Sequence, residues 1–312
     1  IMAYDTLALS PKEWSAGIIG ETTVGSAILT GSGMQINSIS FPTINDQVRN
    51  IEKRAASQGR VLNDTDLDYV ANGGVHEISM SGICDKTSLL LMLENVLGTE
   101  FSSDKITIEP GHNPDHFLHG AGSSGAHNTV CFLIKGPSST GAANDSYNLR
   151  GSCITSLTLS SDMGTDGGRF TFDLTAQSRY PFTSTAAAQS GYTINAPAET
   201  YLNMGDFTGT TIIYDQECIL DSFSLVIENP VTYLGMAADG IPEAMQRSIP
   251  ALDITANCTV KYDDSTDTFL DNFRTQAVAQ PADLTAVANG TGGNAQCAAL
   301  YLANNATWAS AT

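Results

Sequence analysis

Positive charge is scarce in this chain, and so are charged side chains of any kind. Charged residues make up 15% of the 312 positions, and 14 Lys and Arg face 33 Asp and Glu, which gives a net charge of −19. Affinity for nucleic acid or for an anionic membrane depends on clustered Lys and Arg. The composition therefore excludes adhesive binding to either surface.

Long apolar runs are also missing. No stretch approaches the roughly 18 to 20 apolar residues that span a bilayer, and the N-terminus lacks a basic segment followed by an apolar core. We expect a soluble, unexported protein with no membrane insertion.

Cysteine pairs at short spacing are absent, because the six cysteines are widely separated and form no Cys-x-x-Cys motif. Several of them fall at apolar strand positions, which favours buried thiols over disulfides. They are Cys84, Cys131, Cys153, Cys218, Cys258 and Cys297.

Catalytic signatures are missing too, since the chain has no His-Glu-x-x-His, no Gly-x-Ser-x-Gly and no Walker loop. Gly120 to Gly125 has the spacing of a dinucleotide fingerprint, but it leads into a β-like run instead of a helix. Four histidines cluster within sixteen residues and are weak candidates for a metal site, although the surrounding glycine and proline favour a polar loop. The four are His112, His116, His119 and His127. We expect no cofactor and no catalytic residues.

The clearest pattern that is present lies between Leu252 and Asp263. Leu, Ile, Ala, Cys, Val and Tyr alternate there with Asp, Thr, Asn and Lys. Only a half-buried strand has this period of two. Burying four of the apolar side chains is worth on the order of 6 to 12 kcal/mol, so the register of the strand is well defined.

The same alternation marks the neighbours of this strand. Residues 154–159 and 170–176 predict one hairpin, and residues 223–227 pair with the strand from Leu252 in a second one. A strand over 76–83 and two short helices, over 85–97 and 267–276, are also expected. The fold class is mainly β, a sandwich or partial barrel with one or two short helices and four antiparallel strands at its centre.

Composition favours one domain over residues 1–312. Within it we expect an N-terminal arm over 1–45, an insertion or long loop over 109–148 and a C-terminal extension over 281–312.

Taken in order, these segments resemble the tail tube (major tail) proteins of long-tailed bacteriophages, which are similar in fold to the tube protein of type VI secretion. The resemblance rests on Gly59-Arg60 with Asp64 to Asp68, on the strand-to-helix unit Ser79 to Gly98, on Phe223 to Asn229, and on Ile254 to Tyr262 followed by the helix Asp267 to Phe273.

The resemblance implies a structural virion protein and not an enzyme. Each subunit is expected to give four strands to a ring-shaped barrel of six subunits, and stacked rings form a conduit for DNA ejection, through which DNA passes without specific binding. Expected partners are further copies of the chain, a sheath, a tape measure protein and a tail terminator. The protein is expected in the virion tail after assembly in the host cytoplasm.

The resemblance also implies roles for individual residues. The lumen-facing candidates are Asp173, Asp221, Glu228 and Asp253 with their Thr or Ser neighbours, and Lys261 would interrupt their acidic face. The candidates for contacts between rings are Arg49, Lys53, Arg54, Arg60, Glu243 and Arg247. Two alternatives stay open: another β-rich virion component, such as a capsid decoration or tail completion protein, and a metal-dependent β-sandwich enzyme that uses the histidine loop.

Overall fold

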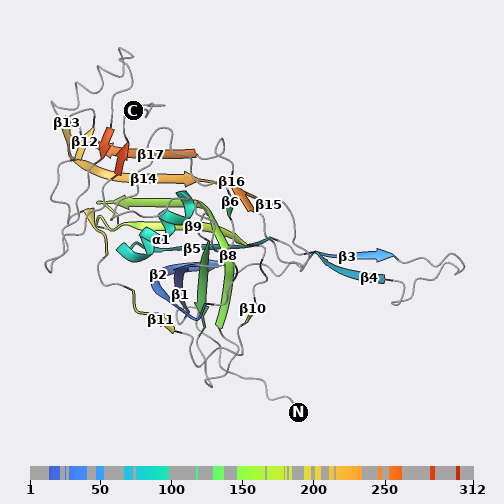
Figure 1. Ribbon diagram of the computed structural model, residues 1–312. Helices are drawn as coiled ribbons and strands as arrows, with labels where there is room; N and C mark the ends of the chain where they lie inside the picture. The colour runs from blue at the N-terminus through green and yellow to red at the C-terminus, as the bar shows by residue number, and fades with distance from the viewer. Residues whose placement is uncertain are drawn as a thin grey trace, which may run out of the picture.

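In a computed structural model, the described residues form two layers of β-strands with one helix against them (Figure 1). The structure describes residues 14–21, 25, 28–40, 47–52, 67–72, 75–97, 117–118, 129–136, 146–165, 167–178, 180, 183–184, 193–197, 201–204, 211–213, 216–233, 245–247, 253–261, 282–284 and 300–302. The expected class, mainly β with a short helix, is confirmed.

The larger layer is an antiparallel sheet with the strand order β17-β14-β8-β9-β5-β2. The four strands expected at the centre of the fold are neighbours in it, and β5 and β2 extend the sheet to six strands. Their bounds are β2 Thr30–Ser40, β5 His76–Ile83, β8 Ser146–Asp162, β9 Thr171–Ser178, β14 Leu220–Glu228 and β17 Asp253–Val260.

Alternating burial explains why these segments form strands. In β14, Phe223, Leu225 and Ile227 are buried while the residues between them are more exposed. Burying three such side chains is worth about 5 to 9 kcal/mol, and only one register achieves it.

The smaller layer contains β1 Ser15–Gly20, β7 Val130–Lys135 and the first half of both β2 and β8. Strand β8 is 17 residues long and passes from one layer into the other, pairing first with β7 and then with β9 and β14. The order β8-β7-β1-β2-β5-β9 returns to β8, so the hydrogen-bonded strands form a closed circuit. Two short strands add to it, β10 Thr183–Ser184 and β11 Thr193–Asn195.

A buried carboxylate holds the bend of β8. Glu21 is 3% exposed, and its side chain accepts hydrogen bonds from Thr129 Oγ1 at 2.5 Å, Gly151 N at 3.0 Å and Gly25 N at 3.1 Å. Gly151 has φ 57°, a left-handed conformation that suits glycine, and the pairing of β7 with β8 shifts register beside it. Burial raises the pKa of Glu21, while these hydrogen bonds and the charge of Arg150 act in the opposite direction.

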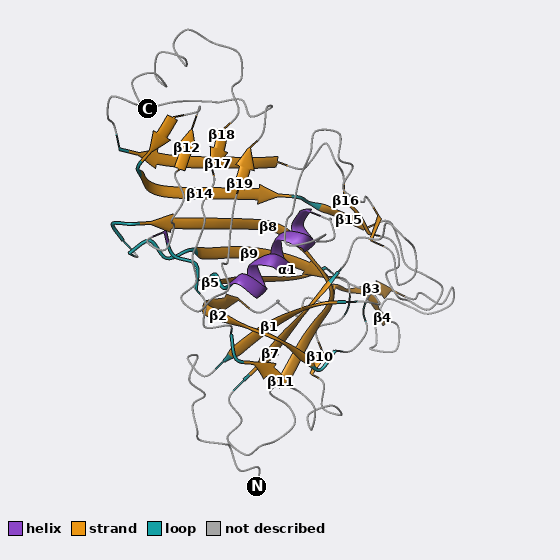
Figure 2. Cartoon of the chain, turned by 60° about the vertical axis from the view of Figure 1, so that its left-hand side comes forward, coloured by secondary structure: helices purple, strands orange, loops and turns teal. Residues whose placement is uncertain are grey.

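The helix α1 Lys86–Leu97 covers the apolar side of the larger sheet (Figure 2). Asp85 caps its N-terminus, because its Oδ1 accepts from the N–H groups of Thr87 and Ser88 at 3.0 Å. At the other end Asn229 Nδ2 donates to Val96 O at 2.7 Å, which ties the helix to the end of β14. The helix expected over 85–97 is thereby confirmed, whereas the helix expected over 267–276 lies outside the described residues.

Further strands lie around the two layers. The hairpin of β3 Gln47–Glu52 and β4 Leu67–Asn72 extends away from them, between β2 and β5 in the chain (Figure 1). The others are β6 Phe117–Leu118, β12 Thr211–Ile213, β13 Gln216–Cys218, β15 Val231–Tyr233, β16 Met245–Arg247, β18 Ala282–Leu284 and β19 Leu300–Leu302. The segments expected as an N-terminal arm, 1–45, and as an insertion or long loop, 109–148, contain strands of the sheets: β1 and β2 lie within the first and β7 within the second.

Candidate functional site

The side of the larger sheet that faces away from α1 is lined with hydroxyl groups, and we call it the hydroxyl face. It exists because the alternate residues of six neighbouring strands point to one side while the apolar ones pack toward the helix. It consists mainly of Ser38, Ser40, Ser79, Ser81, Ser156, Thr158, Ser160, Thr171, Asp173, Thr175, Ser222, Ser224, Glu228, Asp253, Thr255, Asn257 and Thr259, with Ile83 and Val226 as apolar members.

Strand register arranges these residues in rows that cross the sheet. One row runs Asp253, Glu228, Ser156, Thr175, Ser79, Ser40. The next row runs Thr255, Val226, Thr158, Asp173, Ser81, Ser38. The face is therefore continuous from one margin of the sheet to the other.

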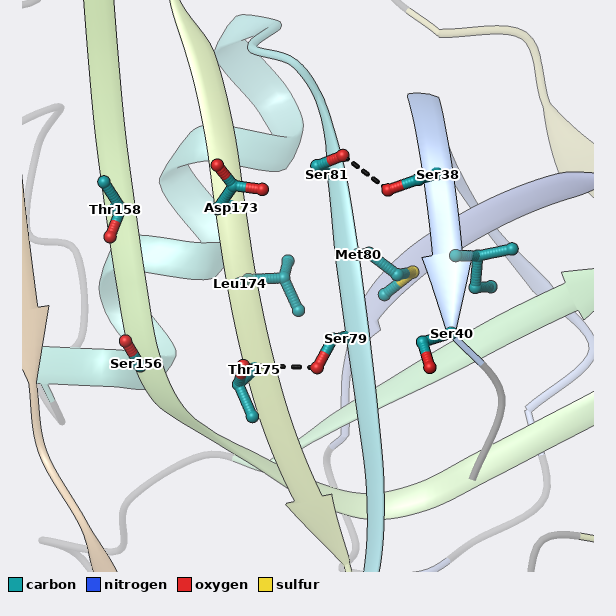
Figure 3. A pocket seen from close by; sticks show the side chains of 11 residues that line it. Ser38, Ser40, Ser79, Met80, Ser81, Ser156, Thr158, Asp173, Leu174 and Thr175 are labelled. Carbon is teal, nitrogen blue, oxygen red and sulfur yellow. Dashed lines mark hydrogen bonds between the residues drawn. The ribbon is translucent and has the colours of Figure 1, made fainter. Parts of the chain in front are cut away.

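The hydroxyl groups bind one another across the strands (Figure 3). Ser38 Oγ lies 2.7 Å from Ser81 Oγ, and Ser79 Oγ lies 3.3 Å from Thr175 Oγ1. A pocket of about 280 Å³ opens among these strands and is lined mostly by the same small polar residues. Because these four hydroxyls bond to one another and hydroxyl groups carry no charge, this part of the surface offers little to hold a ligand.

Carboxylates supply the charge of this face. Asp173, Glu228 and Asp253, which the sequence analysis named as candidates, all lie on it, and Glu228 and Asp253 are direct cross-strand partners. Asp221 is exposed at the irregular start of β14, between Leu220 and Ser222, and has no partner of its own in β17. Like charges directly opposite one another repel, so the pair of Glu228 and Asp253 lowers the local stability of the sheet.

No Lys or Arg occupies a position of the hydroxyl face in the six described strands. The exposed residue Lys261 follows the last residue of β17. The serines and threonines beside the acidic candidates, which the sequence analysis grouped with them, lie on this face, and their alternation in 156–160 and 222–224 is the signal in the sequence.

Of the candidates for contacts between rings, only two lie among the described residues. Arg49 lies in β3 and Arg247 in β16, and the strands they occupy pair with β4 and β15. Lys53, Arg54, Arg60 and Glu243 lie outside the described residues, as do the four clustered histidines.

Three observations concern metal sites, membrane spans and reactive cysteines. The part of the chain that the structure describes contains no group of three His, Cys, Asp or Glu side chains placed to hold a metal ion. Its single helix is too short to cross a membrane. Cys84 and Cys131 are buried, and burial raises the pKa of both thiols, which disfavours the reactive thiolate.

Comparison with known proteins identifies the family. No curated protein sequence matches the chain significantly. The family model described as phage tail tube protein matches residues 11–306, nearly the whole chain. The chain therefore belongs to the phage tail tube protein family, and is a structural component of a virion tail that assembles from many subunits.

Proposed function

We propose that this chain is the subunit of stacked hexameric rings, and that the hydroxyl face lines the lumen through which DNA leaves the particle. The observation that carries the proposal is the hydroxyl face itself, a six-stranded surface of small polar residues without Lys or Arg. A wall of this kind suits a conduit, since it provides no cations for the phosphates and little apolar surface for the bases.

The charge of the face supports the same function. Asp173, Glu228 and Asp253 repel phosphate, and Asp221 would join them at one end of the sheet. Electrostatic fields fade over about 8 to 10 Å at physiological salt, so only side chains on the wall act on passing DNA. The overall charge of −19 contributes little beyond that distance.

The hairpin of β3 and β4 is suited to contacts between rings because it extends away from both layers (Figure 1). It carries Arg49, and the segment between its strands holds Lys53, Arg54 and Arg60. Glu243 and Arg247 are further candidates for these contacts. A sheath, a tape measure protein and a tail terminator remain proposed partners, and the host cytoplasm the proposed place of assembly.

Electron microscopy of the purified protein tests the assembly. Rings with six-fold symmetry, alone or stacked into tubes, are expected. A protein that stays monomeric across concentrations and salts, or that forms rings of another symmetry, would contradict the proposal.

Labelling tests which face lines the lumen. Thr255→Cys places a thiol on the hydroxyl face, and Thr87→Cys places one on the exposed start of α1, on the other side of the sheet. A maleimide attached to a particle wider than the lumen should label both variants as subunits, but only Thr87→Cys in tubes. The unmodified protein gives the background from native cysteines, and equal labelling of the two variants in tubes would show that the hydroxyl face is outside.

A further inference from the structure

The two margins of the larger sheet are strand edges without a described partner. Strand β17 pairs with β14 along one side, and no described strand pairs with its other side. Figure 2 shows β12 and β18 near β17, but they pair with β13 and β19. At the opposite margin, residues 35–40 of β2 pair with β5, while β1 and β11 pair only with residues 30–34.

Strand direction makes these edges compatible. All five pairings in the order β17-β14-β8-β9-β5-β2 are antiparallel, so the first and last of the six strands run in opposite directions. A rotated copy of the subunit therefore presents its β2 antiparallel to β17. Antiparallel pairing is slightly more stable per residue than parallel pairing.

The two faces of the edges also match. Thr255, Asn257 and Thr259 of β17 lie on the hydroxyl face, as do Ser38 and Ser40 of β2. On the apolar side, Ile254 is 36% exposed, and Ala256, Cys258 and Val260 are only half-buried. Ile36 and Ile39 of β2 are likewise half-buried against the core. Joining the edges would continue both faces and cover the apolar side chains that the margins leave partly exposed.

Two of the features that prevent strand addition are missing from both edges, although β2 has an irregularity of register between Ile36 and Ser38. Proline and inward-pointing lysine block such edges in natural sheets, and both are absent from 253–260 and from 35–40. The sequences of the two edges therefore permit pairing with another chain.

From these observations we infer that β17 of one subunit pairs antiparallel with residues 35–40 of β2 in the next subunit, so that a second copy of this chain occupies each edge. The inference rests on the proposed ring and assigns the strands that close it. The contact joins two different edges, and repetition by rotation gives a closed ring with one β17–β2 junction per subunit.

Two edge variants test the junction. Ile254→Lys points a charge into the apolar side of the β17 margin, and Ile39→Lys does the same at β2. Each variant keeps one intact edge, so each alone should sediment as a monomer, while an equimolar mixture should give a dimer that grows no further. Ile219→Lys is the control, because Ile219 is 58% exposed and lies outside both edges, and this variant should form rings.

Circular dichroism establishes that each variant is folded before its assembly is judged. Rings formed by Ile254→Lys, or a mixture that stays monomeric although both variants are folded, would overturn the β17–β2 junction. If the unmodified protein forms no rings, both the proposed function and the β17–β2 junction fail. If the unmodified protein and both edge variants form rings, only the strand assignment fails.

Cross-linking provides a test that leaves the edges intact. A subunit with both Thr255→Cys and Ser38→Cys, treated in rings with a short bis-maleimide, should give a ladder of covalent species up to the hexamer. Each single variant should give no ladder beyond the native cysteine background. A double variant that forms rings but gives no ladder would contradict the junction.

The lumen diameter is a third measurement. At a strand spacing of about 4.8 Å, six strands from each of six subunits enclose a backbone ring about 55 Å across, and strand tilt widens it. Four strands from each subunit would give about 37 Å. A diameter near the smaller figure would exclude β2 from the wall and overturn the inference.

Discussion

Removing the buried carboxylate of Glu21 should strongly destabilise the subunit, because several buried donors share this one acceptor. In Glu21→Ala, Gly151 N and Thr129 Oγ1 lose their acceptor in a buried site. Each buried donor left without a partner costs about 1 to 3 kcal/mol, so the loss is on the order of 2 to 6 kcal/mol. The total free energy of unfolding of a typical domain is only about 5 to 15 kcal/mol.

Glu21→Gln is the matched control. It keeps a carbonyl oxygen for Gly151 and Thr129 and removes the charge that burial penalises. We expect it to cost much less than the alanine variant. The bond from Arg150 Nη1 to Gly25 O, at 3.3 Å, remains available in both variants.

Urea unfolding at one protein concentration measures the effect, because assembly would otherwise stabilise the folded form by mass action. For a urea dependence of about 1 to 3 kcal/mol per molar, the midpoint of the alanine variant should fall by at least about 0.7 M. An alanine variant as stable as the unmodified protein would refute the conclusion that this carboxylate holds the bend of β8.

The pH dependence of the same comparison follows from the direction of the pKa shift. Burial raises the pKa of Glu21 in the folded subunit, so the folded state binds the proton more readily than the unfolded chain. The stability that Glu21 gains from this shift is fully present below the pKa of the unfolded chain, about 4.3. It is lost as pH rises through the pKa of Glu21 in the folded subunit. On lowering the pH from neutral, the unmodified protein should therefore gain stability relative to Glu21→Gln, and the opposite trend would refute the assignment.

Three further predictions concern single residues. Asp85→Ala removes the N-cap of α1 and should lower the free energy of unfolding by about 0.5 to 2 kcal/mol in urea melts, with Asp85→Asn close to the unmodified protein. Gly82→Ala places a Cβ 2.0 Å from Gln35 O and should disrupt the pairing of β2 with β5, seen as a loss of amide protection in hydrogen exchange. Glu228→Gln should slightly stabilise the subunit by relieving its repulsion from Asp253, an effect that calorimetry should find at low salt and lose at high salt.

Short-range patterns predicted the part of the fold that depends on them. The period of two in β14 and β17 and the apolar stripe of α1 are properties of neighbouring residues, and the elements appear where the sequence places them. The same pattern cannot distinguish a central strand from an edge strand. Ile254 and Ile227 read alike in sequence, yet Ile254 is 36% exposed because β17 lies at the margin of the sheet.

The parts that escaped sequence analysis depend on contacts between distant residues. Glu21 reads as an ordinary polar residue after a glycine, and its partners Thr129 and Gly151 lie 108 and 130 residues further along the chain. The strands β1 and β7 are buried on both faces and so lack alternation. The full extent of the hydroxyl face arises only when register aligns residues from six strands, although three of the four acidic candidates and the Thr and Ser residues beside them were predicted to share one face.

The hairpin of β3 and β4 has a consequence for how this protein can change. Ser40 and Ser79 are register partners, so the intervening excursion occupies the place of a turn between two neighbouring strands. The entropy of closing a loop grows slowly with its length, by about 0.6 kcal/mol for each doubling. Insertions within the excursion therefore leave the sheet intact, and this position can vary in length or carry a foreign peptide without disturbing the fold of the subunit.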